Sequence, residues 1–245
     1  MTQRLPANIH IGTSGWQYRH WWGLFYPKHT PPGRMFEEYL KHFDTVELNS
    51  SFYHQPPRAT FENWKKKTPA GFLFAVKVNR YITHNKKLHD AEESLTYFLS
   101  AARGLGKKLG PLLFQLPPSF GINLERLEQF LKRLPKRECT FEFRHPSWMT
   151  EEVYRLLKKY NAAFCIYDLG GFETPHEVTT DFIYIRLHGP GLKYRGNYRK
   201  GILRKWAEEI GEWKRHVKNI YVYFDNDVGG HAPKNALTLR ELVTA

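Results

Sequence analysis

The ten residues CTFEFRHPSW, at positions 139–148, decide how this chain is interpreted. Side chains alternate along a strand with period two, so Phe141 and Phe143 share one face, while Glu142 and Arg144 share the other. Charged side chains at the end of a buried strand are costly unless they are paired or used. The stretch therefore predicts a buried strand that ends in an active or binding site.

Similar apolar runs recur along the chain and alternate with helical patterns. We expect strands over 9–16, 45–53, 72–79, 112–117, 139–145, 162–169, 182–189 and 220–227. We expect helices over 34–43, 59–67, 124–134, 150–160, 205–216 and 235–243, and one more that Asp90 caps with Glu93 in a capping box. Asn123 and Thr150 are the expected caps of two others.

Strands alternating with helices predict parallel βαβ units, and eight such units in about 250 residues match a closed barrel. We therefore expect an α/β fold, a single (β/α)8 TIM-like barrel over 1–245, with a short and poorly helical link between strands six and seven (GGFETPHEVTTD). An open doubly wound sheet is the alternative. No strand is followed by the GxGxxG turn that such a sheet uses to bind dinucleotides, which favours the barrel.

The composition indicates a folded, basic protein. Lys and Arg total 37 against 24 Asp and Glu, a net charge of +13, which favours an anionic small molecule or nucleic acid as partner. Two cysteines in apolar runs indicate buried thiols in a reducing compartment. Because we see neither a signal peptide nor an apolar run of membrane-span length, we expect a cytoplasmic protein without a membrane partner. The cofactor and the oligomeric state stay unknown at this stage.

Polar residues gather where the expected strands end, which is where barrel enzymes place their active sites. As catalytic groups we predict Glu142, His188, His145 and Glu47. As substrate-binding groups we predict Arg144, Arg186, Lys77, Asn49, Gln115, Trp16, Trp148, Tyr194, Tyr198, Asp225 and Asn226. The alternative is a buried ion-pair network that only neutralises itself, with Glu47–Lys77 and Glu142–Arg144 or Arg186 as pairs.

A metal is not expected at these strand ends. Glu47, Glu142, Asp168, His188 and Asp225 could converge on a divalent ion, but nearby arginines would repel it, and neither HxxxH nor CxxC spacing is present.

The loops after strands seven and eight carry a second signal. GPGLKYRGNYRKG, at 189–201, interleaves four cations with two tyrosines, and Gly229 and Gly230 precede a helix. Barrels often bind phosphate in these two loops, and basic residues among aromatics also suit a nucleic-acid strand. A flexible, solvated loop is the third interpretation.

Several motifs together resemble the family called domain of unknown function 72, the YecE-like proteins. They are GTSGWQYRHWWGLFYP, FDTVELNSSFYHQPP, FAVKVNRYITH, LGPLLFQLPPSF, FEFRHPSW, YIRLHG and YVYFDNDVGGHAPKNA, in collinear order over nearly the whole chain. The resemblance implies a TIM-like barrel and no established general activity. Asp225 departs from the Asn that we would expect there, which would alter the charge presented to a ligand.

Two hypotheses for the function follow. The first is an enzyme, a hydrolase or lyase, acting on a phosphate-bearing or other anionic substrate at the C-terminal face of the barrel. The alternative is a nucleic-acid-binding protein, possibly a nuclease, since the barrel is distantly similar to that of endonuclease IV; a likeness of fold cannot carry function.

Overall fold

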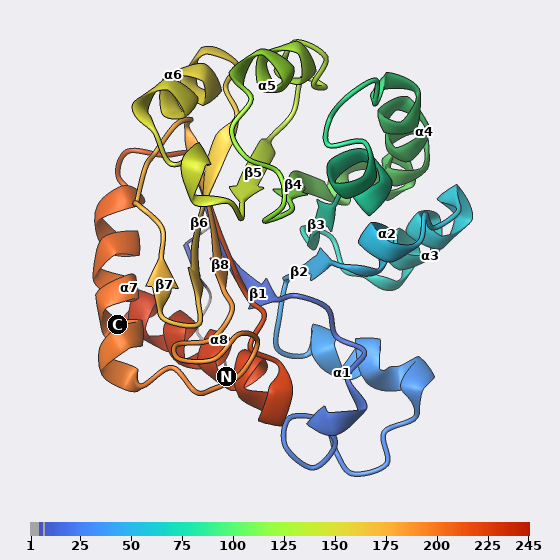
Figure 1. The fold of residues 1–245 in the computed structure, drawn as a ribbon. Helices are drawn as coiled ribbons and strands as arrows, with labels where there is room; N and C mark the ends of the chain where they lie inside the picture. Colours follow the sequence, from blue (N-terminus) through green and yellow to red (C-terminus); the bar gives the residue numbers. More distant parts are fainter. Residues whose placement is uncertain (1–4, 7) are drawn as a thin grey trace. The chain divides into compact units, whose positions relative to one another are not determined.

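The computed structural model describes residues 5, 6 and 8–245 (Figure 1). Its strands are β1 (Ile9–Thr13), β2 (Thr45–Leu48), β3 (Leu73–Lys77), β4 (Leu109–Leu116), β5 (Cys139–Phe143), β6 (Ala163–Leu169), β7 (Phe172–Glu173), β8 (Phe182–Leu187) and β9 (Asn219–Phe224). Its α-helices are α1 (Met35–Leu40), α2 (Ser50–Tyr53), α3 (Arg58–Lys67), α4 (Glu92–Ala102), α5 (Leu124–Leu131), α6 (Glu151–Lys159), α7 (Lys200–Trp213) and α8 (His231–Thr244).

The strands follow one another in the order β1-β9-β8-β6-β5-β4-β3-β2, with β7 paired to β6 beside this path. A parallel bridge between Ser14 and Glu47 joins the segments that end β1 and β2. Eight strands in this order, with helices between them, make the α/β fold a TIM-like barrel, as the sequence predicts. Strands β2, β5 and β8 are buried at every residue, and β1, β3, β4, β6 and β9 at all but one, which is why they read as nearly continuous apolar runs.

The contacts divide the chain into two compact units. Unit 1 holds residues 1–47, 166–174 and 181–245, and unit 2 holds 48–165 and 175–180. The expectation that residues 1–245 form one domain stays a prediction.

Unit 1 is built on three adjacent parallel strands. β1 pairs with β9 from Ile9–Ile220 to Thr13–Phe224, and β9 pairs with β8 as far as Leu187–Phe224, both without a break in register. Helices α7 and α8 pack against each other, and α8 also packs on β1. Because the strands run in register, their last residues reach the same edge, and the side chains that follow them meet there.

Unit 2 places β4 between β3 and β5. β4 pairs in register with β5 from Leu112–Cys139 to Leu116–Phe143, while the pairing with β3 shifts between Phe74 and Val76. The Phe114 and Phe141 rings stack at 5.0 Å across that pair. Helix α3 packs on α4, and α5 packs on α6. The carboxyl ends of β3, β4 and β5 therefore lie on one edge of this sheet.

The predicted elements are present, but several bounds differ. β1 ends at Thr13 rather than at residue 16, and α7 begins at Lys200 rather than at residue 205. The run 45–53 is a strand only as far as Leu48, and Ser50–Tyr53 form the short helix α2, because polar Asn49 turns the chain. Asp90 does not cap α4: the N-cap is Ala91, without a side-chain bond, and Asp90 adopts a left-handed φ of 44°. A capping residue needs extended backbone, which Asp90 lacks here.

Three further predictions concern two helix N-termini and one link. Asn123 caps α5, and its Oδ1 accepts from the Arg126 amide at 2.9 Å. Thr150 is the N-cap of α6, without a side-chain cap bond. The link between β6 and β8, residues 170–181, has no helix, as expected. It contains the two-residue strand β7, which pairs antiparallel with β6.

Candidate functional site

Unit 1 buries a network of polar side chains around Arg186, near the carboxyl end of β8. Its Nε donates to Glu47 Oε2 at 2.9 Å, and its Nη2 donates to Glu47 Oε1 at 2.6 Å. Glu47 also accepts from the hydroxyls of Ser14 and Tyr184, the latter at 2.6 Å. Two-point pairing offsets the desolvation of a buried ion pair only when the remaining lone pairs are also filled. Four donor groups meet that condition for Glu47.

His188 and Asp225 extend this network. His188 Nδ1 lies 3.0 Å from Asp225 Oδ2, and its Nε2 lies 3.3 Å from Arg186 Nη1. A guanidinium can only donate, so Nε2 accepts and the ring proton is on Nδ1, donated to Asp225. Arg186 also donates to Asp225 at 3.1 Å. Both nitrogens of the buried imidazole therefore have protein partners.

The tyrosine of this network stays protonated. Burial raises the pKa of Tyr184 well above its ordinary value, and the charge of Glu47 acts in the same direction. The geometry in unit 1 is thus that of a buried ion-pair network, with Glu47 paired to Arg186 inside the same unit. The catalytic roles expected of Glu47 and His188, and the ligand contact expected of Arg186 and Asp225, stay predictions.

Unit 2 gathers a different cluster, beyond the carboxyl end of β3. The Lys77 ammonium lies 4.2 Å from the centre of the Phe52 ring, a cation–π contact. The His84 ring meets the same phenyl ring edge-on at 4.9 Å. His84 belongs to the π-helical turn Tyr81–Asn85 directly after the strand, a wide turn often found at functional sites.

The charges around His84 are mainly positive. Burial lowers its pKa most, Lys77, Arg80 and Arg144 act in the same direction and Glu142 acts against them, and the resulting pKa is about 4. His84 is therefore a neutral imidazole at pH 7. Its Nδ1 lies 2.9 Å from the Thr83 hydroxyl; if that hydroxyl donates, Nε2 carries the ring proton.

Glu142 and Arg144 pair with each other at the end of β5. Glu142 is fully buried, and the Arg144 side chain is nearly so. They project from the same face of the strand, as the alternation in the sequence predicts. One of the ion pairs expected in the self-neutralising alternative is therefore present in unit 2.

The residues after β5 have packing and capping contacts. His145 Nδ1 accepts from the Ser147 amide at 3.2 Å and lies 2.8 Å from its hydroxyl. Trp148 is buried, donates from Nε1 to the Phe120 carbonyl at 2.6 Å and stacks on Phe143 at 4.9 Å. These contacts show that His145 and Trp148 stabilise the local structure. Their functional roles stay predictions.

The remaining candidates are spread over both units. In unit 2, Asn49 and Gln115 are half-buried at the ends of β2 and β4. In unit 1, Trp16 is buried and stacks on Phe36 at 4.4 Å. Asn226 is buried and donates to the Gly196 carbonyl at 2.8 Å. Trp16 therefore packs in the core of unit 1, and Asn226 makes a buried hydrogen bond there.

The loop after β8 is anchored to its own strand. The Gly189 amide donates to the Tyr198 hydroxyl at 2.9 Å, and the Tyr194 amide donates to the His188 carbonyl at 2.6 Å. Gly189 has a φ of 120°, and a Cβ there would lie 2.1 Å from the Arg195 carbonyl oxygen, so only glycine fits. Tyr198 is buried, whereas Tyr194 is exposed, with its ring 5.5 Å from His188.

This loop does not offer the backbone donors that a phosphate would need at Gly189, because that amide is used internally. Its four cations are exposed: Lys193, Arg195, Arg199 and Lys200. The loop therefore presents side-chain charge rather than a backbone cradle.

Among the charged and titratable residues of the His84 cluster, two were not predicted site residues, namely His84 itself and Arg80. Both belong to the segment that follows β3, where the sequence runs from a buried strand into a polar, aromatic turn. Their position directly after a buried strand is the feature of the sequence that could have identified them as site residues. Over residues 5, 6 and 8–245, no group of three His, Cys, Asp or Glu side chains could hold a metal ion. In the same part of the chain, no helix is both long and apolar enough to cross a membrane.

Comparison with known proteins places the chain among proteins without an assigned activity. Residues 10–245 match the family model described as "Protein of unknown function DUF72". The chain is 27% identical to UPF0759 protein YunF of Bacillus subtilis (strain 168) over 274 residues, covering 96% of this chain and 94% of that protein. It is 30% identical to UPF0759 protein YecE of Escherichia coli (strain K12) over 145 residues, covering 58% and 51%.

Solved structures agree with the fold. A DUF72 family protein from Thermotoga maritima is 32% identical with a TM-score of 0.89, covering 97% of this chain and 100% of that one. A DUF72 family protein from Enterococcus faecalis is 22% identical with a TM-score of 0.84, covering 97% and 96%, and shows the fold alone.

Proposed function

Because the chain belongs to the DUF72 family of proteins of unknown function, we propose its function from its own site: an enzyme that acts on a phosphate-bearing or other anionic substrate. The substrate's anionic group binds beyond the carboxyl ends of β3 and β5 in unit 2. The observation that carries the proposal is that the Lys77 ammonium and the His84 ring pack on the same Phe52 ring, with Arg80 and Arg144 adding positive charge around His84. A positive, partly buried cluster at strand ends is where a barrel enzyme binds an anion.

Each residue of the cluster has a chemical task in this proposal. Arg144 offers a planar fork of donors suited to phosphate or carboxylate oxygens, and Lys77 adds a point charge held by the Phe52 ring. Neutral His84 donates a hydrogen bond from Nε2 to the bound group. Glu142, whose charge acts on His84, is the carboxylate assigned to exchange a proton with the substrate.

A phosphate-binding screen tests this function. A panel of phosphorylated small molecules should raise the thermal unfolding temperature of the wild-type protein, because a ligand that binds only the folded state stabilises it. Arg144→Gln and Arg80→Ala should each weaken that response. Lys136→Ala, which removes an exposed cation elsewhere in unit 2, should leave it unchanged.

The proposal fails if both variants respond to every active compound as the wild type does. Arg144→Gln removes the partner of buried Glu142 and could unfold the protein for that reason alone. Arg80→Ala alters an exposed side chain, so its result stands independently.

The second candidate is nucleic-acid binding, and the anchored loop after β8 favours it. Tyr198 fixes the loop, while four exposed cations and Tyr194 face solvent. Phosphate contacts of this kind release counterions, so affinity for labelled DNA or RNA should fall steeply with salt. Fluorescence anisotropy at two salt concentrations measures this, with Lys193, Arg195, Arg199 and Lys200 neutralised together as the test variant. Absent or salt-insensitive binding excludes this candidate.

A further inference from the structure

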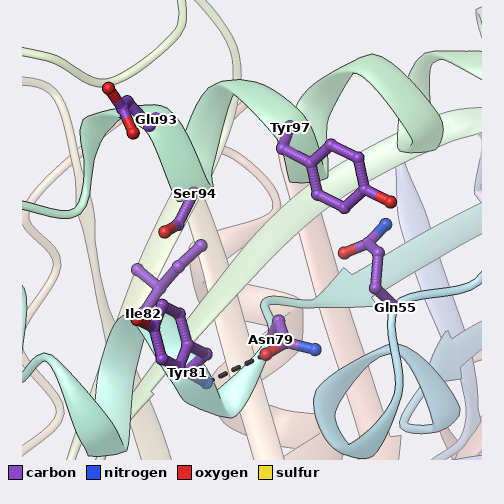
Figure 2. A pocket seen from close by; sticks show the side chains of 7 residues that line it. All are labelled: Gln55, Asn79, Tyr81, Ile82, Glu93, Ser94 and Tyr97. Carbon is purple, nitrogen blue, oxygen red and sulfur yellow. Dashed lines mark hydrogen bonds between the residues drawn. The ribbon is translucent and has the colours of Figure 1, made fainter.

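Unit 2 contains a cavity of about 390 Å³ in the segments that follow β2 and β3 (Figure 2). Gln55 contributes from the segment after α2, Asn79 and Tyr81 from the turn after β3, and Ser94 and Tyr97 from α4. The volume is that of a site for a small organic molecule. Segments after the carboxyl ends of strands form the functional face of a barrel, so the position also favours a ligand site.

Two tyrosines give the cavity aromatic walls. Tyr81 is 52% exposed and Tyr97 is 67% exposed, although both line a hollow. Figure 2 shows them on different elements, Tyr81 on the π-helical turn and Tyr97 on α4. Exposed aromatic faces on both sides of a cavity suit a planar ring, because stacking on tyrosine tolerates any π-face.

Two side-chain amides supply the polar edge. The Asn79 amide is fixed by two bonds: its Oδ1 accepts from the Tyr81 amide at 2.9 Å, and its Nδ2 donates to the Ser51 carbonyl at 3.1 Å. Nδ2 has a second hydrogen to offer. Gln55 donates to the Pro56 carbonyl at 3.3 Å and has its Oε1 as an acceptor. Asn and Gln amides match the adjacent donors and acceptors on the edge of a nucleobase.

The cavity itself is not built for an anion. Glu93 is the one formally charged side chain among its lining residues, and it is negative. A negative group of the ligand must therefore lie outside the cavity. The positive cluster around His84 provides a place for that group.

The cavity and the His84 cluster share two segments of chain. Residues 51–55 give Phe52 to the cluster and Gln55 to the cavity, and residues 77–84 give Lys77 and His84 to the cluster and Asn79 to the cavity. The Ser51 hydroxyl donates to the Lys77 carbonyl at 2.7 Å, which ties the segments together. A ligand with a ring and a nearby phosphate would engage both.

From this arrangement we infer that the cavity binds the base of a nucleotide, whose phosphate meets Arg80 and the His84 cluster. The inference rests on the proposed function and narrows its substrate class to nucleotides. Tyr97 and Tyr81 stack on the base, the Asn79 and Gln55 amides bond its edge, and Glu93 accepts from an exocyclic amino group.

Isothermal titration with a matched set of probes tests the inference. The probes are AMP, GMP, CMP and UMP, ribose 5-phosphate, which lacks the base, and adenosine, which lacks the phosphate. At least one nucleotide should bind about tenfold or more tighter than ribose 5-phosphate, the size expected for stacking one base. Tyr97→Ala should abolish most of that ratio. Tyr53→Ala, which removes an exposed tyrosine of unit 2 outside the lining, should preserve the ratio.

The outcomes separate the two proposals. If ribose 5-phosphate binds as tightly as every nucleotide, the base site is wrong and the anionic-substrate function stands. If adenosine binds and Tyr97→Ala weakens it, while Arg80→Ala changes no affinity, the base site stands and the phosphate site is wrong. If no probe binds, the base site is wrong, and the wider panel of phosphorylated molecules decides the anionic-substrate function.

Discussion

The buried network of unit 1 and the His84 cluster of unit 2 differ in how the protein uses its own charges. Arg186 in unit 1 is fully buried and donates to Glu47 and Asp225, so its charge is met by two carboxylates. In unit 2 three cations act on half-buried His84, and one carboxylate, Glu142, opposes them. A network whose acceptors and donors match holds a fold in place, whereas a surplus of one sign suits a ligand of the other.

Two similar sequence patterns therefore lie in different electrostatic surroundings. Glu142–Arg144 and Arg186–His188 are both same-face pairs at strand ends. The first belongs to the cation-rich cluster, and the second belongs to the saturated network. Four predictions test this contrast, in order of the size of the effect on stability.

Replacing Arg186 should cost the most stability. Arg186→Met leaves Glu47 buried without its main partner, and breaking such a pair costs about 3–5 kcal/mol of the free energy of unfolding. Urea denaturation measures this. The double variant Glu47→Gln with Arg186→Met should recover part of the loss, because it removes the unpaired charge. A single-variant loss below about 1 kcal/mol would show that the network is not a structural centre.

Removing one hydroxyl from the same network should have a smaller effect. Tyr184→Phe deletes the O–H that donates to Glu47 at 2.6 Å and keeps the ring in the core. A hydrogen bond to a charged group contributes about 1.5–3 kcal/mol, so unfolding in urea should shift by that amount. Tyr160→Phe, which removes a hydroxyl bonded to Glu128 nearer the surface, is the control and should cost less. Equal losses would contradict the claim that the hydrogen bond to buried Glu47 contributes more to stability than the one to Glu128.

The His84 cluster should make stability depend on pH. The folded-state pKa of His84 is lowered to about 4 from 6.5, so between these values the unfolded chain binds more protons. The His84 contribution is therefore complete above about pH 6.5 and is lost as pH falls towards 4. Allowing for solvent screening of this half-buried group, we expect a loss on the order of 1 kcal/mol.

The matched variant for this pH dependence is His84→Asn, which cannot titrate. Its urea midpoint should vary less than that of the wild type between pH 6.5 and 4. If the pH profiles of the wild type and the variant run parallel, the claim that the folded protein lowers the pKa of His84 is contradicted.

The smallest effect on stability should come from Arg80, although it belongs to the proposed ligand site. Arg80→Ala changes an exposed side chain, so the free energy of unfolding should stay within about 0.5 kcal/mol of the wild type. The affinity for the phosphorylated compound that binds the wild type should nevertheless fall several-fold. Unchanged affinity would place the anion site elsewhere.

Much of the architecture could be predicted because it follows from local patterns. Period-two alternation placed Glu142 and Arg144 on one face of β5, and apolar runs between helical patterns predicted the parallel barrel order. The errors arose where local signals compete. Asn49 ends a run whose apolar content continues through α2, and Asp90 lies near a helix start without the backbone conformation of a cap.

The sequence by itself determined the fold class, the family and the strand ends at which polar residues gather, since these depend on spacing along the chain. Only the tertiary structure decided which charges pair. Glu47 and Arg186 are 139 residues apart and lie within hydrogen-bonding distance, and burial, together with Lys77, Arg80 and Arg144, keeps His84 neutral. Electrostatic interactions depend on distance in space and on burial, and neither is written in the order of the residues.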